Sequence, residues 1–277
     1  MSSSSRPARV ASGREGEPGG TKPPGLTIDV ITIFPPMIDA ALSEGVIGRA
    51  REAGLVRVQA RDLRDYTEDR HRTVDDQAYG GGPGMVMKPG PIVAAVEAIA
   101  AERGPASAVV LMTPQGRRFT HTEAERLSRL DRITVICGRY EAVDERVAET
   151  VVTDELSIGD YVLTGGELPA LVVIDAIARL VPGVVGDADS VAGDSFVRGL
   201  LDSPHYTRPA VFRDRAVPQV LLSGHHGEIE QWRRRERVKR TLERRPDLMA
   251  TAELDADELR ELNRLRAEVD AANEHGK

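Results

Sequence analysis

Short apolar runs alternate with helix-type patterns between Leu26 and Val181, and this alternation limits the possible folds more than any other feature. The runs are Thr27–Ile33, Leu55–Ala60, Ala108–Met112 and Ile133–Cys137. Runs of this length that are rich in β-branched residues are typical of buried strands. Strands that alternate with helices predict an α/β domain with a largely parallel sheet.

Helix signals separate these strands. Pro35 and Pro36 predict a helix that reaches about Leu42, because proline is tolerated in a first helical turn. Thr122 and Glu125 have the spacing of a capping box, which predicts that a helix begins there. Helical spacing also predicts a helix that contains Ile92, Val93, Val96 and Ile99.

Loop signals follow three of the strand ends. The three segments are Thr113–Gly116, Gly138–Glu141 and Ile158–Gly166. In open α/β sheets, ligands bind beyond the carboxyl ends of the strands. We therefore expect the three loops to converge on one pocket; the alternative is that they are three unrelated turns.

The third loop ends in a glycine pair. Gly165 and Gly166 have no Cβ, so the backbone there can adopt positive φ and lie close to a ligand. Glu167 and Pro169 suit the first turn of the helix that follows, and the apolar stretch Leu168–Val181 predicts that this helix is buried. The segment is thus either a backbone cradle for a small organic ligand or an ordinary turn into a helix.

Composition changes after Pro182. Residues 186–199 are rich in Gly, Asp, Ser and Ala, which is typical of a linker. The chain then becomes charged and helical and ends in an amphipathic helix with Leu259, Leu262, Leu265 and Val269. We expect a disordered extension at 1–25, an α/β domain at 26–185, a flexible linker at 186–199 and a small, mainly helical domain at 200–277.

Basic residues cluster in this C-terminal region although the chain has a net charge of −7. An acidic balance argues against a surface uniformly suited to nucleic acid, but it permits a local basic patch. A smaller group is Arg70, His71 and Arg72, and the larger one lies beside Trp232. Its members are Arg233, Arg234, Arg235, Arg237, Lys239, Arg240, Arg244 and Arg245. This run predicts contact with a nucleic-acid backbone; the alternative is a solvated helix face.

Several site classes have no support in the sequence. No G-x-G-x-x-G motif follows the first strand, and Gly80–Gly84 lacks the Lys and Ser or Thr of a P-loop. The single cysteine, Cys137, excludes an internal disulfide framework, and we expect no metal ligands. No apolar run has the length of a membrane span, so we expect no membrane contact and a cytoplasmic location.

Two charged residues near the predicted linker are candidates for catalysis. Asp194 lies in the segment Gly193–Phe196, and Arg179 lies near the end of the predicted buried helix. A carboxylate and a guanidinium beside a pocket can act as general base and charge stabiliser. Each residue taken alone is more simply explained as an ordinary surface residue.

Several ordered motifs together resemble those of the bacterial tRNA (guanine-N1)-methyltransferases, a family of knotted SPOUT methyltransferases. The resemblance extends from Leu26 to the final helices. Its motifs are Asp69–Asp76, Tyr79–Met85, Pro114–Gly116, Cys137–Glu141, Ser157–Pro169, Asp194–Phe196, Pro204–Pro209 and Leu221–His225. Thr113 stands where serine is frequent in the family, and the N-terminal extension has no counterpart there.

The resemblance implies a trefoil-knotted α/β domain that binds S-adenosylmethionine and works as a homodimer. It also implies methylation of guanine 37 of tRNA, no DNA partner, and a magnesium requirement without assigned ligands. The matching catalytic pair is Asp194 and Arg179, and Asp202 matches a cofactor-facing carboxylate from the partner chain. The matching cofactor contacts are Pro114, Gly138, Tyr140, Glu141, Ile158, Gly159, Asp160, Tyr161, Val162, Leu163, Gly165, Gly166 and Pro169.

The implied chemistry gives each catalytic residue a task. Guanine N1 carries a proton and is a poor nucleophile, so Asp194 is expected to accept this proton and Arg179 to stabilise the charge that forms on the base. Two other functions stay open. They are a related knotted enzyme that methylates ribose 2′-hydroxyls and a non-enzymatic RNA-binding protein with the same fold.

Overall fold

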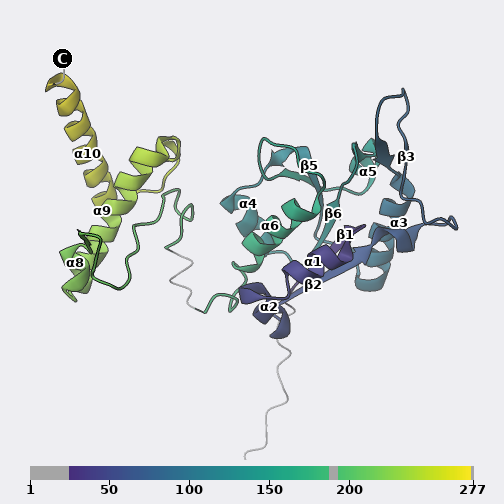
Figure 1. Ribbon diagram of the computed structural model, residues 1–277, viewed down its shortest axis with the longest axis horizontal. Coiled ribbons are helices and arrows are strands. Elements are labelled where there is room, and N and C mark those ends of the chain that lie inside the picture. The colour runs from purple at the N-terminus through teal and green to yellow at the C-terminus, as the bar shows by residue number, and fades with distance from the viewer. Residues whose placement is uncertain (1–24, 187–192, 276–277) are drawn as a thin grey trace, which may run out of the picture.

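The computed structural model describes residues 25–186 and 193–275. The predicted disordered extension lies outside these residues except for Gly25, and residues 187–192 of the predicted linker lie outside them as well. Figure 1 shows a part that contains the main sheet and, further along the chain, a mainly helical part. Of the helices in the described ranges, none is both long enough and apolar enough to cross a membrane.

A five-stranded parallel sheet forms the centre of the first part. The strand order is β2-β1-β6-β5-β8, and each neighbouring pair is parallel. The α/β class and the parallel sheet predicted from the sequence are thereby confirmed. The bounds are β1 Leu26–Thr32, β2 Val56–Asp62, β5 Ala108–Arg118, β6 Arg132–Cys137 and β8 Asp154–Ser157.

Helices cover both faces of this sheet. On one face lie α1 Pro35–Ala41, α2 Gly45–Glu52, α4 His121–Ser128 and α6 Glu167–Ala178, and on the other lie α3 Pro89–Arg103 and α5 Glu145–Thr150. Successive strand residues point to opposite faces. Ile28 and Val30 therefore join the first core, whereas Ile31 joins the second. Burial on both faces explains why β1, β6 and the segment Ala108–Met112 of β5 are mostly apolar.

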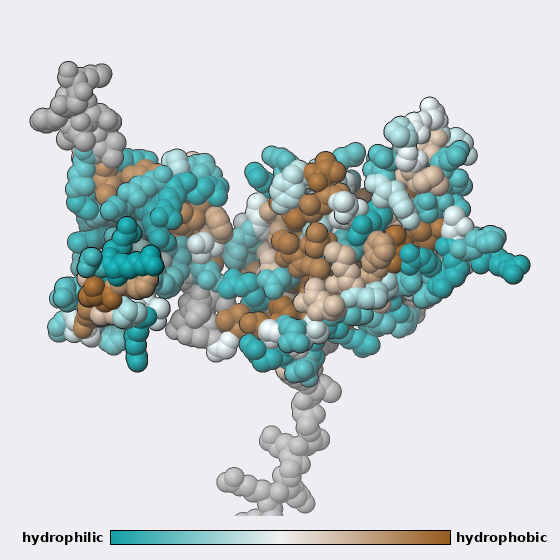
Figure 2. All heavy atoms as spheres, in the orientation of Figure 1, coloured by the Kyte–Doolittle hydropathy of each residue, from teal (hydrophilic) through white to brown (hydrophobic). Residues whose placement is uncertain are grey.

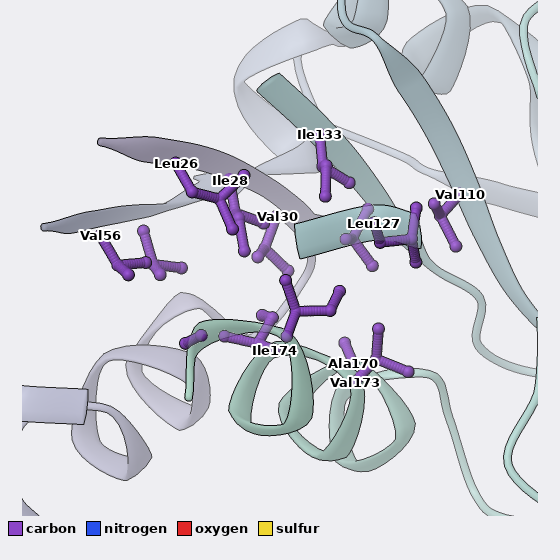
Figure 3. Packing of buried hydrophobic residues seen from close by; sticks show 14 of the residues in the cluster. Leu26, Ile28, Val30, Val56, Val110, Leu127, Ile133, Ala170, Val173 and Ile174 are labelled. Carbon is purple, nitrogen blue, oxygen red and sulfur yellow. The ribbon is translucent and has the colours of Figure 1, made fainter. Parts of the chain in front are cut away.

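Helix α6 packs into the first core beneath the centre of the sheet (Figure 3). Its Ala170, Val173 and Ile174 side chains lie with Ile28 and Ile133 in this core, and all five are buried. Truncating a buried isoleucine such as Ile174 to alanine costs about 2–5 kcal/mol. This packing fixes where α6 begins, and thus where the loop before it ends.

Two helix predictions need correction. Helix α4 begins at His121 with Thr120 at its N-cap, so Thr122 lies inside the helix and the expected capping box does not form. The backbone N–H of Phe119 donates to Ser157 at 2.8 Å, which keeps the chain extended up to that point. Helix α6 is buried along one side only, since Leu168 and Val172 are each 49% exposed.

The first loop also differs from its prediction. Strand β5 does not end at Met112 but continues to Arg118. Both Met112 and Arg117 are paired with Leu156 of β8, so the residues between them leave the pairing as a bulge. The segment Thr113–Gly116 therefore interrupts a strand, and the strand is paired with β8 both before and after it.

Short elements complete the structure. A small sheet contains β3 Asp75–Gln77, β4 Met85–Met87 and β7 Ala142–Val143, and a 3₁₀ turn covers Leu63–Tyr66. The C-terminal part contains β9 Val211–Phe212, β10 Arg215–Ala216, α8 Gln219–Leu222, α9 His226–Arg244, a 3₁₀ turn Pro246–Ala250 and α10 Ala256–His275. The predicted final helix is confirmed as α10, which packs against α9.

Candidate functional site

A cavity of about 290 Å³ lies beyond the carboxyl ends of β6 and β8, next to the bulge in β5. Its walls include residues of all three predicted loops, for example Pro114, Tyr140 and Leu163. The expectation that these loops converge on one pocket is confirmed. The convergence follows from the strand order, because β6, β5 and β8 are neighbours in the sheet.

Most of the predicted cofactor contacts line this cavity. The lining ones are Pro114, Gly138, Tyr140, Glu141, Ile158, Gly159, Tyr161, Val162, Leu163, Gly165, Gly166 and Pro169. Asp160 and Asp202 do not line it. Val143 of β7 and Ala148 of α5 line it as well. Val143 was not predicted from the sequence, because β7 is placed by its pairing with the distant strand β4.

The glycine pair serves close packing rather than positive φ. Neither Gly165 nor Gly166 has positive φ, and Gly166 has a φ of −80°, so that expectation is wrong. The backbone N–H of Gly166 donates to Gly138 at 2.8 Å. A Cβ on Gly166 would lie 2.7 Å from the Cα of Cys137. The second and third loops thus touch backbone to backbone, which only glycine permits.

A buried polar network lies directly behind these two loops. Glu167 is fully buried, and its carboxylate accepts from Thr32 Oγ1 and from Arg139 Nε, each at 2.7 Å. Arg139 also donates from Nη1 to the backbone oxygen of Thr164 at 3.1 Å. The Arg139 guanidinium carbon lies 4.6 Å from the centre of the Phe34 ring. Both carboxylate oxygens of Glu167 therefore have a partner.

Tyr140 occupies an unusual position on the second loop. Its φ is +62°, a left-handed backbone conformation that residues other than glycine rarely adopt. Burial and the negative charge of Asp75 raise the pKa of its phenol. Such strained backbone is often found at ligand sites, where the surrounding structure maintains it.

The predicted catalytic pair is in contact. Arg179 Nη2 donates to Asp194 Oδ2 at 2.6 Å, and both side chains are about one-third exposed. Neither residue lines the cavity of its own chain. The two groups can act together on one bound molecule, since a carboxylate accepts protons and a guanidinium stabilises negative charge.

Asp202 lies close to the same segment. Its backbone N–H donates to Ser195 Oγ at 3.0 Å, and its carboxylate contacts His205 Nε2 at 2.7 Å. Burial disfavours the charged carboxylate, but hydrogen bonds from His205 and from the backbone N–H of Ser203 outweigh it and lower the pKa of Asp202. The structure therefore groups Asp202 with Asp194 rather than with the cavity.

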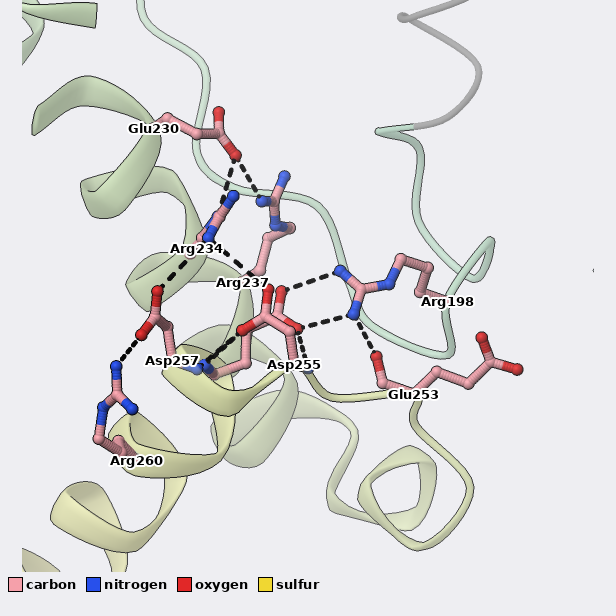
Figure 4. A network of polar contacts seen from close by, with 9 residues as sticks. Arg198, Glu230, Arg234, Arg237, Glu253, Asp255, Asp257 and Arg260 are labelled. Carbon is pink, nitrogen blue, oxygen red and sulfur yellow. Dashed lines mark hydrogen bonds and ion pairs between the residues drawn. The ribbon is translucent and has the colours of Figure 1, made fainter. Parts of the chain in front are cut away.

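The chain around Arg198 is attached to the C-terminal helices (Figure 4). Arg198 donates to the buried carboxylate of Glu258 at 2.9 Å and to the backbone oxygen of Glu253 at 2.5 Å. Leu200 is buried, and Leu201 N–H donates to Thr241 Oγ1 at 2.8 Å. Arg198 of the predicted linker thus contacts α10, and Leu201, just after the linker, contacts α9.

Much of the predicted basic run is paired within its own domain. Arg234 lies within 3.7 Å of carboxylates of Glu230, Asp255 and Asp257, and Arg237 donates to Glu230 at 2.9 Å (Figure 4). Arg233, Arg235 and Arg245 also have carboxylate partners. Within residues 25–186 and 193–275, no hydrogen bond or ion pair is made by the side chains of Lys239, Arg240 and Arg244.

The smaller basic group forms a tight turn. The carboxylate of Asp69 accepts from the backbone N–H groups of His71 and Thr73 at 2.9 and 3.0 Å. Arg72 is paired with Asp65, which leaves Arg70 and His71 exposed at the tip. In the part of the chain that the structure describes, no cluster of three or more His, Cys, Asp or Glu residues could hold a metal ion.

Comparison with known proteins gives a consistent result. A family model described as tRNA (Guanine-1)-methyltransferase TrmD matches residues 26–251. The chain is 54% identical over 227 residues to a tRNA (guanine-N(1)-)-methyltransferase of Chloroflexus aggregans, which covers 82% of this chain and 89% of the relative. A protein of the same name from Halorhodospira halophila is 52% identical over 252 residues, with 90% and 96% covered. One from Pelotomaculum thermopropionicum is 52% identical over 245 residues, with 88% and 98% covered.

Proposed function

Because this chain belongs to the tRNA (guanine-1)-methyltransferase family and is therefore a methyltransferase, we propose that it methylates N1 of guanine 37 in tRNA with S-adenosylmethionine as donor. The product would be 1-methylguanosine next to the anticodon. The observation that most supports this proposal is the cavity where three loops meet. Nearly all of the donor-binding residues expected from the sequence line that cavity.

The cavity suits the donor in size and lining. Its volume of about 290 Å³ lies at the lower end of the range for small-molecule sites. Ile158, Leu163 and Pro169 offer apolar surface for an adenine ring, and the glycines of the second and third loops let the backbone lie close to it. When bound, S-adenosylmethionine supplies a methyl group that is already electrophilic because it is attached to a sulfonium. The protein then needs mainly to orient the guanine.

The catalytic pair would make guanine N1 nucleophilic. Asp194 accepts the N1 proton as general base, and Arg179 stabilises the negative charge that develops on the guanine oxygen. Their hydrogen bond of 2.6 Å orients the carboxylate before the base arrives. The guanine has to leave its stack to reach the cavity, so part of the RNA-binding energy is used to flip it.

A homodimer would bring the catalytic pair to a cavity. Arg179, Asp194 and Asp202 do not line the cavity of their own chain. Phe34, Leu168 and Val172 form exposed apolar surface, at 42, 49 and 49% exposure. Figure 2 shows apolar residues gathered in the region where Figure 1 draws α1 and α6. Exposed apolar patches of this kind often mark protein interfaces. We assign this face to a second copy of the chain, whose cavity would receive the catalytic pair and Asp202.

The C-terminal helices would hold the tRNA. Lys239, Arg240 and Arg244 are the basic side chains of α9 for which a phosphate backbone is the natural partner. Action on tRNA also implies a cytoplasmic location. The trefoil knot and the need for magnesium stay predictions of the family resemblance.

One experiment tests the reaction directly. The purified protein is incubated with labelled S-adenosylmethionine and tRNA transcripts that carry guanine or adenine at position 37, and the nucleosides are then analysed. We expect label in 1-methylguanosine from the first transcript only. Equal labelling of both transcripts would contradict the site assignment, and 2′-O-methyl nucleosides would favour a ribose methyltransferase. Absence of donor binding by calorimetry would favour a non-enzymatic RNA-binding protein.

A further inference from the structure

Glu167 carries a buried charge for which the reaction itself has no use. The residue is fully buried at the first position of α6 and does not line the cavity. Burying an ionised carboxylate is costly unless it is paired and hydrogen-bonded. A position at a helix N-terminus would accept an exposed acid equally well, so helix formation alone does not account for the burial.

The partners of Glu167 come from separate strand ends. Thr32 is the last residue of β1, and Arg139 follows β6 by two positions. Arg139 extends the network to the backbone of Thr164, which lies on the third loop after β8. One carboxylate thereby connects the end of the sheet to two of the loops that form the cavity.

We propose that Glu167 is a positioning residue that fixes the distance between the second and third loops and so shapes the methyl-donor cavity. This inference rests on the proposed function, since the cavity is taken to hold S-adenosylmethionine. Arg139 is held at Nε by Glu167 and at Nη1 by Thr164, so its guanidinium bridges the helix start and the loop before it. Without the carboxylate, a largely buried guanidinium has no counter-charge and has to move towards water.

The two loops have little freedom to absorb such a movement. Gly166 N–H is bonded to Gly138, and Gly165 and Arg139 form a bridge between the loops. Gly165 also packs directly on the Arg139 side chain, where no Cβ could fit. A displaced Arg139 therefore displaces Gly138 and Gly165, both of which line the cavity.

Asp29 provides a matched control on the same strand. It is a buried carboxylate of β1, and it pairs with Arg61 at 2.9 Å and with Arg103 at 3.6 Å. Its partners lie on β2 and at the end of α3, and none of the three residues lines the cavity. Losing either carboxylate breaks a buried carboxylate–arginine pair, but only the loss at Glu167 reaches the loops.

The test compares Glu167→Gln with Asp29→Asn in the full-length protein. For Glu167→Gln we expect the KM for S-adenosylmethionine to rise about 10- to 100-fold, because small misplacements of binding groups have effects of that size. The KM for tRNA and the kcat at saturating donor should change by less than about threefold, since those steps use other residues. Asp29→Asn should lower the Tm while leaving all three constants near wild type.

Thr32 supplies a second, milder pair of variants. Thr32→Val removes the hydroxyl that donates to Glu167, and Thr32→Ser keeps it. We expect the donor KM to rise for Thr32→Val and to return to the wild-type value for Thr32→Ser. Thr32 does not line the cavity, so a change in packing alone would not make the donor KM depend on whether residue 32 has a hydroxyl.

Hydrogen exchange keeps this inference separable from the proposed function. Peptides that contain residues 138–141 and 164–168 should exchange faster in Glu167→Gln and Thr32→Val than in Asp29→Asn and Thr32→Ser, with no donor present. If the wild-type protein binds no S-adenosylmethionine, the proposed function fails, and this exchange pattern still decides the role of Glu167. Unchanged exchange in both loops, or an equal rise of the KM for donor and for tRNA, would overturn the proposal.

Discussion

Arg179 Nη2 lies 2.6 Å from Asp194 Oδ2, yet neither side chain reaches the cavity that the three loops of the same chain enclose. Arg179 is the C-cap of α6, the helix whose first turn contributes Pro169 to that cavity. One helix thus connects the proposed donor cavity at its start with the proposed catalytic pair at its end. If both assignments hold, donor binding and proton transfer use different residues and can be altered separately.

Changes at Asp194 should stop catalysis and spare donor binding. Asp194→Ala and Asp194→Asn both remove the proton acceptor, so we expect methyl transfer to tRNA to fall about 10²- to 10⁴-fold. Calorimetry should give a donor affinity close to wild type, because the three loops that line the cavity are unchanged in these variants. Near-full methyl transfer by Asp194→Ala would show that another group is the base.

Gly166→Ala should damage the cavity although it adds a single methyl group. The new Cβ would lie 2.7 Å from Cys137 Cα, and the backbone on both sides has to shift. Overpacking of this kind costs about 1–3 kcal/mol. Chemical denaturation measures the loss of stability, and donor titration measures the damage to the cavity.

Gly227→Ala is the matched control for that change. Gly227 lies in the first turn of α9 with nothing near the position of its missing Cβ. Alanine there should stabilise the protein by about 0.4–1 kcal/mol, because it restricts the unfolded chain. A similar loss of stability in both variants would contradict the close packing assigned to Gly166.

The basic residues of α9 should divide into two classes: those that bind RNA and those that pair with carboxylates of their own domain. Lys239→Ala and Arg244→Ala should each weaken tRNA binding and lower the salt dependence of log K by about one unit, as expected for one lost phosphate contact. Arg237→Ala removes the pair with Glu230 and should lower the free energy of unfolding by about 1 kcal/mol. Filter binding at several salt concentrations and thermal melts distinguish the classes. Equal salt effects from Arg237→Ala would show that the pairs open when RNA binds.

Cys137 should be unreactive in the folded protein. Burial raises the pKa of its thiol well above the usual value, and the negative charge of Glu167 adds a smaller effect in the same direction. We expect alkylation by iodoacetamide at pH 8.5 to be slow for the folded protein and fast in denaturant. The neutral thiol favours folding below the pKa of the unfolded thiol, about 8.5, and this contribution is lost as the pH rises above it. In Cys137→Ala this part of the pH dependence should disappear.

The sequence predicted β1, β6 and the first part of β5, and with them the class of the fold, because burial on both faces makes these segments mostly apolar. The order of the strands in the sheet could not be predicted in this way, because it depends on pairing between distant segments. The small sheet of β3, β4 and β7 was not predicted either, because its strands are very short and its pairing joins distant segments. The bulge in β5 was missed because Thr113–Gly116 resembles a turn that ends a strand.

For the site, the sequence identified loops more readily than it identified what holds them. Glycine and proline mark a loop locally, and the rule on carboxyl strand ends brings the three loops together. Glu167 was expected only to favour a helix start. Its burial depends on Thr32, 135 positions away, and on Arg139, 28 positions away, and no local pattern reports such partners. The basic run likewise gave no sign that Glu230 and Asp255 pair with its arginines.

The glycines around the cavity also restrict how this protein can evolve under selection by a drug. Resistance to a competitive inhibitor usually arises from a substitution that blocks the drug and spares the natural ligand. At Gly166 a side chain would meet the backbone of Cys137 and Gly138 within 2.9 Å, and at Gly165 it would meet the Arg139 side chain. An inhibitor that packs against the backbone at these two glycines therefore leaves few substitutions there by which the protein could escape it and still fold.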